Sequence, residues 1–171
     1  QSSTGASGIW QFIASTGREN GLKKNWWYDA RRDIVASTDA AYNFLEKLYA
    51  EHNDWLLAIA AYNAGPSRVR KEVKKNRSKG LPADFWSLNL PKETKAYVPK
   101  ILAIVELIRN PERFNIELPY LANRPYFDVV DLPSQVDLMQ VANISGLKLE
   151  VIYELNPGFN QWATDPNGPF R

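Results

Sequence analysis

The strongest constraint on the fold is a short segment that is apolar on nearly every side and lies between two helix signals. Asp54 is a good N-cap, the residues from Trp55 to Tyr62 are almost all apolar, and Gly65-Pro66 stops a helix. A helix without a polar face has to be surrounded by other elements. The segment therefore predicts the central helix of a helical domain.

Three further helices are predicted around this one. Ser37 or Thr38 is expected to cap a helix with a single apolar face. Residues 67–77 predict a second helix that is rich in Lys and Arg and therefore largely exposed, and residues 92–109 predict a third that carries an apolar stripe. The fold class is accordingly mainly α.

The helical pattern loosens after Asn110, where prolines recur as far as Pro125. We place a linker at 116–125, between a first domain, 1–115, and a C-terminal segment, 126–171.

The C-terminal segment predicts a small α+β unit. Residues 126–131 resemble a strand, and Ser134 is expected to cap a short helix that reaches Ser145. Residues 149–155 predict a second short helix, which ends at Asn156-Pro157-Gly158.

Composition excludes several classes of function. The chain has no Cys and only one His, which argues against a structural zinc site, an iron–sulfur cluster and thiol catalysis. That His52 lies in the polar tail of a predicted helix, where a surface position is expected. A net charge of +2 is too small to indicate a nucleic-acid partner, although it favours approach to an anionic polymer. No apolar run reaches the roughly 18 residues of a membrane span.

Carboxylate chemistry or ligand binding remains. Asp29 and Asp33 flank Arg31 and Arg32 and are most simply helix caps and ion-pair partners. Glu93 is the best carboxylate candidate, because it lies four residues before a tyrosine on the same helix face. A capping role in the first turn of its helix stays open for Glu93.

Two tracts place polar groups where a ligand can approach. In Gly5–Gln11, small residues precede a helix and a Gln amide is expected one turn inside it. In Ala61–Gly65, a phenol and an amide emerge at the end of the central apolar helix. The rim of a hydrophobic core is a common place for a binding site.

These tracts also carry a resemblance. Ser2–Gln11, Tyr28–Asp33, Ala61–Gly65 and Glu93–Lys100, in this order, resemble the lytic transglycosylase family with the goose-lysozyme-like catalytic domain. Each tract is modest alone, but four in register are specific. The resemblance implies a lysozyme-like helical domain that lacks its N-terminal part.

The resemblance also implies an activity. Lytic transglycosylases cleave the β-1,4 bond between N-acetylmuramic acid and N-acetylglucosamine in peptidoglycan and leave a 1,6-anhydro end. One Glu acts as acid and then base, without the second carboxylate of the usual glycosidases. By resemblance, that Glu belongs upstream of Gln1, so this chain is expected to be inactive by itself. The alternative is a non-catalytic module that binds peptidoglycan or chitooligosaccharides.

Site residues follow from the matching positions. Tyr97 matches the phenol beside the catalytic Glu and is expected to assist catalysis. The residues expected to contact the glycan are Ser2, Gln11, Ile13, Tyr62, Asn63 and Glu93. At Ile13 the chain departs from the family, where many members have Met, so the shape of the cleft wall is expected to differ there.

The C-terminal segment resembles a divergent LysM module, a fold that binds N-acetylglucosamine chains. Peptidoglycan glycan strands are therefore the expected partner, with no nucleic acid, no metal and no cofactor. The implied location is the periplasm or the bacterial cell envelope. A lipid anchor to the outer membrane would be encoded before Gln1.

Overall fold

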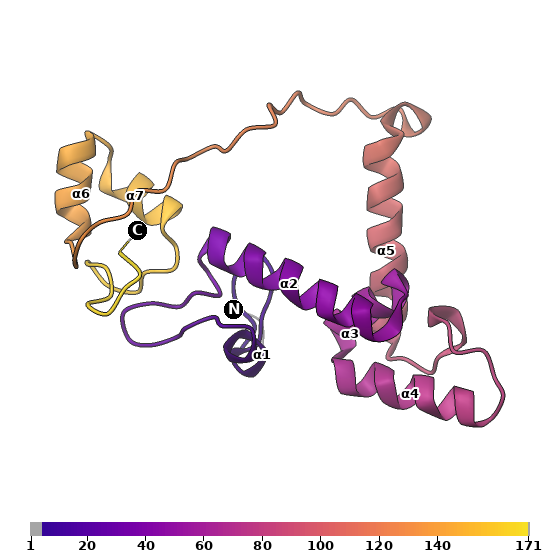
Figure 1. Ribbon diagram of the computed structural model, residues 1–171. Coiled ribbons are helices and arrows are strands. Elements are labelled where there is room, and N and C mark those ends of the chain that lie inside the picture. The colour runs from indigo at the N-terminus through magenta and orange to yellow at the C-terminus, as the bar shows by residue number, and fades with distance from the viewer. Residues whose placement is uncertain (1–4, 171) are drawn as a thin grey trace. The chain divides into compact units, whose positions relative to one another are not determined.

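The structure is a computed structural model that describes residues 5–170 (Figure 1). The α-helices of this range are α1 (Ala14–Glu19), α2 (Ile34–His52), α3 (Trp55–Ala64), α4 (Pro66–Ser78), α5 (Lys92–Arg109), α6 (Leu138–Ser145) and α7 (Leu149–Leu155). Two 3-10 helices, η1 (Phe85–Ser87) and η2 (Pro111–Phe114), follow α4 and α5. Between residues 5 and 170, β-pairing is limited to isolated bridges. The prediction of a mainly α fold is confirmed.

The chain divides into two compact units. Unit 1 runs up to Asn43 and resumes at Arg124, and unit 2 comprises residues 44–123. Helix α2 contributes its first turns to unit 1 and its last turns to unit 2.

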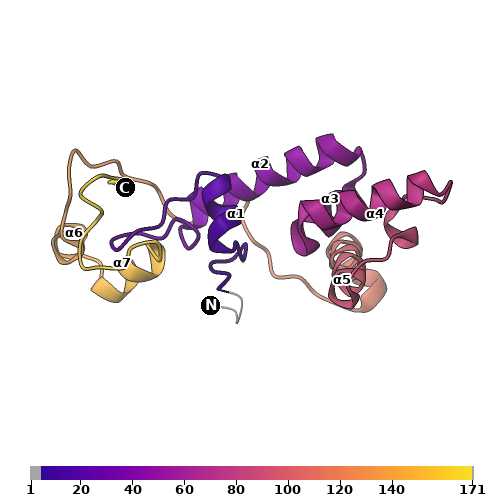
Figure 2. The same ribbon diagram turned by 90° about the horizontal axis from the view of Figure 1, so that it is seen from below.

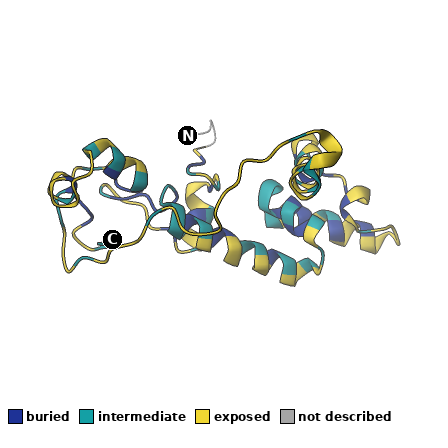
Figure 3. Ribbon diagram, turned by 90° about the horizontal axis from the view of Figure 1, so that it is seen from above, coloured by how far each residue is buried: buried dark blue, intermediate teal, exposed yellow. Residues whose placement is uncertain are grey.

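Helix α3 is the centre of unit 2, as predicted. Asp54 caps it, because its Oδ1 accepts hydrogen bonds from the backbone N–H groups of Leu56 (2.7 Å) and Leu57 (3.1 Å). The small side chains of Ala58, Ala60 and Ala61 are fully buried. They let α4 and α5 pack closely on α3, and the ribbons of the three helices lie together in Figures 2 and 3. The other core residues are Leu48, Leu57, Val69, Val73, Phe85, Leu88, Leu90 and Val98.

Helices α4 and α5 each bury only part of their surface. The basic side chains of α4 are exposed, as predicted, while Val69 and Val73 face the core. Helix α5 has the predicted bounds, and Thr94 and Val98 are buried near its start. The second half of its apolar stripe is uncovered among the described residues, since Ile108 is 57% exposed.

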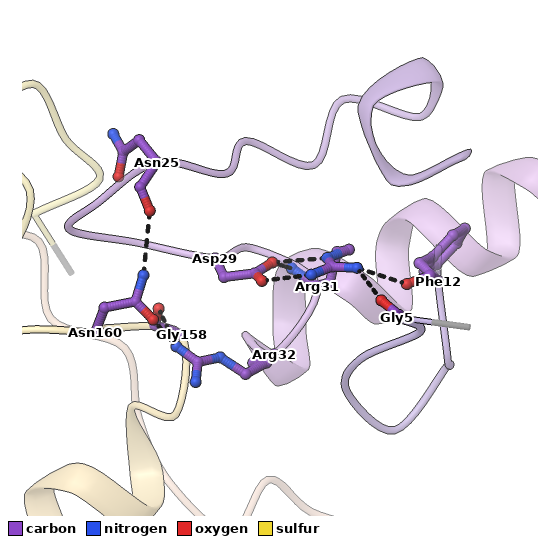
Figure 4. Close-up of polar contacts among 8 residues, drawn as sticks. All are labelled: Gly5, Phe12, Asn25, Asp29, Arg31, Arg32, Gly158 and Asn160. Carbon is purple, nitrogen blue, oxygen red and sulfur yellow. Dashed lines mark hydrogen bonds and ion pairs between the residues drawn. The ribbon is translucent and has the colours of Figure 1, made fainter. Parts of the chain in front are cut away.

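Unit 1 is built around a buried arginine (Figure 4). Arg31 is 1% exposed and forms a bidentate ion pair with Asp29, at 2.9 and 2.7 Å. Its Nη1 also donates to the backbone oxygens of Gly5 (2.9 Å) and Phe12 (3.0 Å). Burial raises the pKa of Asp29, but the hydrogen bonds and charge of Arg31 outweigh burial and leave that pKa below its usual value. The ion pair predicted from sequence is confirmed.

Gly8 makes the close approach to this arginine possible. Its φ is +78°, and a Cβ at this position would lie 1.7 Å from the backbone oxygen of Arg31. Only glycine fits both the backbone conformation and the space.

The Ser37 or Thr38 cap predicted for α2 is wrong, whereas the capping role predicted for Asp33 is confirmed. The helix begins at Ile34, and Asp33 caps it by accepting a hydrogen bond from the backbone N–H of Ala36 at 2.8 Å. Ser37 lies inside the helix, where its hydroxyl donates to the backbone oxygen of Asp33 at 2.5 Å. Several residues here are suitable N-caps. The helix begins after Asp33, where the loop that contains Arg31 ends.

The C-terminal segment agrees with the prediction only in its helices. Helix α7 has the predicted bounds, but α6 begins at Leu138 and is capped by Asp137, whose Oδ1 accepts from Met139 N–H at 2.7 Å, and not by Ser134. The strand predicted at 126–131 is wrong, because no described residue pairs with it in a ladder. A strand needs a partner for its backbone groups, and local sequence does not supply one.

Candidate functional site

Four of the residues singled out in the sequence come together in unit 2. Tyr62 and Asn63 lie in the last turn of α3, and Glu93 and Tyr97 lie in the first turns of α5, a helix that packs directly on α3. The end of the apolar helix therefore does present polar groups at the rim of the core.

Hydrogen bonds orient the amide of this cluster. The hydroxyl of Thr94 donates to Asn63 Oδ1 at 2.7 Å, and Asn63 Nδ2 donates to Glu93 Oε1 at 3.4 Å. Thr94 is 1% exposed, so its hydroxyl has no access to water and holds the amide in one orientation. Sequence reasoning missed Thr94. The available signal was a polar residue four positions before the buried Val98, on the core-facing side of α5.

The two phenols of the cluster remain protonated at neutral pH. Burial, and then the neighbouring Tyr97, raise the pKa of Tyr62 well above its usual value, and burial also raises the pKa of Tyr97. The Tyr62 ring packs on Phe44 with a centroid separation of 5.6 Å. Both hydroxyls are therefore neutral O–H groups on rings held by the core.

Glu93 is the exposed member of the cluster. It lies in the first turn of α5, where its negative charge complements the helix dipole, and the N-cap residue Pro91 makes no side-chain hydrogen bond there. The cluster as a whole offers phenol O–H donors, an oriented amide and a carboxylate. These groups suit a ligand rich in hydroxyl and acetamido groups.

Two other predicted site residues lie in unit 1. Gln11 is exposed in the turn before α1, with φ at 52°, and its Nε2 donates to the backbone oxygen of Gly8 at 2.6 Å. The prediction that Gln11 lies one turn inside a helix is wrong, since α1 begins at Ala14. Ile13 is the N-cap residue of α1 and is 42% exposed. Ser2 lies outside the described residues.

His52 does not have the surface position expected for it. Its side chain at the end of α2 is only 4% exposed, and its Nε2 has no hydrogen-bond partner among the described residues. The neighbouring Glu51 instead pairs with Arg70 of α4, at 2.6 and 2.9 Å, and these hydrogen bonds lower the pKa of Glu51. The Glu51–Arg70 ion pair joins the end of α2 to α4 beside the imidazole.

An apolar cavity of about 420 Å³ lies in unit 1. Helices α6 and α7, the segment 127–132 and the loop 156–158 line it, together with Tyr28 and the start of α2. The loop is not open to solvent throughout, because Gly158 is buried against the Tyr28 ring and its backbone oxygen accepts a hydrogen bond from Asp29 N–H at 2.8 Å.

Within residues 5–170, no group of three or more His, Asp or Glu side chains is arranged to hold a metal ion. None of the described helices is both long and apolar enough to cross a bilayer.

Comparison with known proteins gives matches at both ends of the chain. Residues 1–84 match the family model of the transglycosylase SLT domain, and residues 126–171 match that of the LysM-like domain of lytic transglycosylase MltD. The resemblance stated from the sequence motifs is confirmed.

Individual relatives agree with the family models. The chain is 44% identical over 169 residues to membrane-bound lytic murein transglycosylase D of Escherichia coli strain K12, which is 98% of this chain and 37% of that protein. The same figures hold for the protein of that name from strain O6:H1. A putative tributyltin chloride resistance protein of Alteromonas sp. strain M-1 is 31% identical over 134 residues, which is 78% of this chain and 63% of that protein. The chain thus spans little more than a third of the length of the transglycosylase D relatives.

Proposed function

This chain belongs to the lytic transglycosylase family, and we propose from that premise that it is the glycan-binding part of an enzyme that cleaves peptidoglycan. The substrate is the glycan strand of alternating N-acetylmuramic acid and N-acetylglucosamine. The observation that carries the proposal is the cluster at the junction of α3 and α5, where a buried hydroxyl holds the Asn63 amide beside two phenols.

Each residue of the cluster has a role that its chemistry fits. The Asn63 amide and the Glu93 carboxylate bind the acetamido and hydroxyl groups of the sugar. The Tyr62 hydroxyl donates a hydrogen bond to a sugar oxygen. Tyr97, also protonated, donates to the catalytic carboxylate or to the reacting oxygen, and so assists the proton transfer.

In unit 1, Gln11 and Ile13 contact the glycan from the turn before α1. Ser2, which lies outside the described residues, is proposed as a further glycan contact. Gln11 supplies an amide and Ile13 an exposed apolar surface. The Ile side chain, where many family members have Met, changes the shape of the wall and not its polarity.

The proton donor is a glutamate in the part of the protein that precedes Gln1. Its proton goes to the glycosidic oxygen as the bond to C1 of the muramic residue breaks. The 6-hydroxyl of the same residue then attacks C1 and gives its proton to the glutamate, which closes the 1,6-anhydro ring. The substrate supplies the nucleophile, so one carboxyl group suffices. The 171-residue chain alone binds glycan without cutting it.

We propose the same division into domains that the sequence predicts. Residues 1–115 form the lysozyme-like domain without its N-terminal part, 116–125 link it, and 126–171 form the LysM-like segment. The protein acts in the periplasm or cell envelope. The printed name of the E. coli relatives, which includes the term membrane-bound, supports this location.

Digestion of purified peptidoglycan tests the proposal. The full-length protein and the 171-residue chain are incubated with peptidoglycan, and the soluble products are analysed by mass spectrometry. We expect anhydro-muropeptides from the full-length protein alone, and sedimentation of the 171-residue chain with peptidoglycan.

Three results contradict parts of this proposal. Reducing ends in place of anhydro ends would indicate a hydrolase. Anhydro products from the 171-residue chain would show that its own residues supply the acid. A full-length protein that binds peptidoglycan but releases nothing would be a non-catalytic module.

A further inference from the structure

Three tryptophans from distant parts of the sequence meet on unit 1. Trp26 and Trp27 lie in the loop between α1 and α2, and Trp162 lies in the segment after α7. Their ring centroids are 4.7 to 6.0 Å apart, and all three pairs are in edge-to-face contact. We call these three residues the tryptophan platform.

The platform is not part of the hydrophobic core. Trp26 is 59% exposed and Trp162 is 55% exposed, while Trp27, in ring contact with both, is half-buried. The indole N–H groups of the three residues make no hydrogen bond within residues 5–170. Two exposed indoles leave much apolar surface in water, so they contribute little to the stability of the fold. An exposed cluster of aromatic side chains is typical of a binding site.

Backbone and side-chain hydrogen bonds hold the platform in place. Asn160 N–H donates to the backbone oxygen of Trp27 at 2.8 Å, and the Gln161 amide donates to that of Trp26 at 3.1 Å. The Asn160 amide also donates to the backbone oxygen of Asn25 at 3.2 Å (Figure 4). These bonds join the loop before α2 directly to the segment that carries Trp162.

A buried charge strengthens the same joint. Asp165 is fully buried and pairs with Lys23 at 2.7 Å, and it accepts a hydrogen bond from the Asn25 amide at 2.5 Å. Lys23 and Asn25 precede the tryptophans of the loop, and Asp165 follows Trp162. The backbone that carries the three rings is thus held in place before any ligand binds, which lowers the conformational entropy that binding costs.

We propose that the tryptophan platform binds the sugar rings of a β-1,4-linked N-acetylhexosamine strand. One face of a pyranose ring presents C–H groups and packs on an indole, while the indole N–H groups donate to sugar oxygens. Gln161, whose side-chain oxygen makes no hydrogen bond among the described residues, supplies an acceptor for an acetamido N–H.

A lipid surface is the competing ligand, because tryptophans also favour membrane interfaces. The surroundings of the platform favour the glycan. They include the amide side chains of Asn25, Asn160 and Gln161. Of the two lysines before the loop tryptophans, Lys23 pairs with Asp165, and Lys24 is a single exposed charge without an ion pair among the described residues. A patch for an anionic bilayer would instead carry unpaired Lys or Arg around an apolar centre.

This inference rests on the proposed function for the identity of the strand, and its test uses the 171-residue chain. The probe is penta-N-acetylchitopentaose, with binding measured by isothermal titration calorimetry and by tryptophan fluorescence. The variants are Trp26→Ala/Trp162→Ala, the ring-preserving Trp162→Phe, and Trp86→Ala as a control. Trp86 is 64% exposed in unit 2 and takes no part in the platform.

We expect the double alanine variant to bind at least about tenfold more weakly, since two ring contacts are lost. Trp162→Phe and Trp86→Ala should stay within about threefold of the unchanged chain. Near-UV circular dichroism and urea unfolding check that each variant is folded. The phenylalanine variant separates loss of a ring surface from loss of structure, because it keeps an aromatic ring at the same place.

Several outcomes would overturn the inference. One is equal oligosaccharide affinity of the double alanine variant and the unchanged chain. Another is the absence of any oligosaccharide binding by the unchanged chain. The third is a double alanine variant that loses binding to phosphatidylglycerol vesicles but keeps its affinity for the oligosaccharide. The proposed function fails separately. Suppose that the full-length protein releases no anhydro-muropeptides while the double alanine variant still binds the oligosaccharide more weakly. That result would refute the proposed reaction and would still support glycan binding by the tryptophan platform.

Discussion

The buried pair of Asp29 and Arg31 is the most informative position for testing the fold of unit 1. Asp29→Asn keeps the shape of the side chain but removes the charge that faces a 1%-exposed guanidinium. Breaking a buried ion pair from one side costs about 3–5 kcal/mol, because the remaining charge stays buried without compensation. We expect a loss of about 3 kcal/mol, the low end, since Arg31 retains the backbone oxygens of Gly5 and Phe12 as acceptors.

The same pair predicts a pH dependence. The pKa of Asp29 is lowered in the folded protein, so the ionised form contributes stability above the unfolded value near 3.8, and this contribution is lost as the pH falls through the folded pKa. Asp29→Asn has no carboxylate at this position, so it lacks this pH-dependent contribution to stability. The difference between Asp29→Asn and the unchanged chain should therefore be constant from about pH 7 to pH 5 and shrink in more acidic solution.

Urea unfolding followed by tryptophan fluorescence and circular dichroism, at pH 7, 5 and 3.5, measures this difference. Asp39→Asn is the matched control, because Asp39 is exposed on α2 and its side chain makes no hydrogen bond or ion pair among the described residues. The control should change the free energy of unfolding by less than about 0.5 kcal/mol. A loss below about 1 kcal/mol for Asp29→Asn at pH 7, or one as large at pH 3.5 as at pH 7, would refute the reasoning.

Three other changes test separate parts of the structure. Gly8→Ala should destabilise the chain by more than about 3 kcal/mol in urea unfolding, while Gly80→Ala, with a φ of +67° but no atom near the added Cβ, should cost about 1 kcal/mol. Asp137→Ala should cost about 1 kcal/mol of stability through loss of the α6 cap, and Ser134→Ala close to nothing; equal losses would restore the serine as the cap. Thr94→Val should weaken oligosaccharide binding about five- to tenfold with little change in the unfolding midpoint, because the asparagine amide of the site loses its fixed orientation. Unchanged affinity would show that the hydroxyl is only structural.

The lysozyme-like part and the C-terminal segment share one structural joint in unit 1. The loop 23–32 forms hydrogen bonds and an ion pair with residues 158–168, and the Tyr28 ring packs on Phe159. The two segments that match family models, residues 1–84 and 126–171, are therefore joined by these contacts as well as by the chain between them. We expect loss of the C-terminal segment to destabilise the loop that carries Trp26 and Trp27.

Much of the candidate site could be predicted from sequence because its residues belong to short tracts with local signals. Tyr62 and Asn63 follow an apolar run, Glu93 and Tyr97 open a helix, and these two helix ends pack together. Thr94 was missed, since a buried hydroxyl and an exposed one look alike until the partner amide is placed beside it.

By itself, the sequence determined the elements whose signals are local. The bounds of α5 and α7 and the cap and central position of α3 follow from periodicity, from Asp54 and from Gly65-Pro66, all within a few residues of the helix ends. Tertiary structure alone decided which of several suitable residues caps α2 and α6, whether residues 126–131 find a strand partner, and how deeply His52 is buried. It also brought Trp162 to Trp26 and Trp27. The reason is the same in each case: burial and pairing depend on groups far away in the chain, whereas helix initiation and termination depend on neighbours.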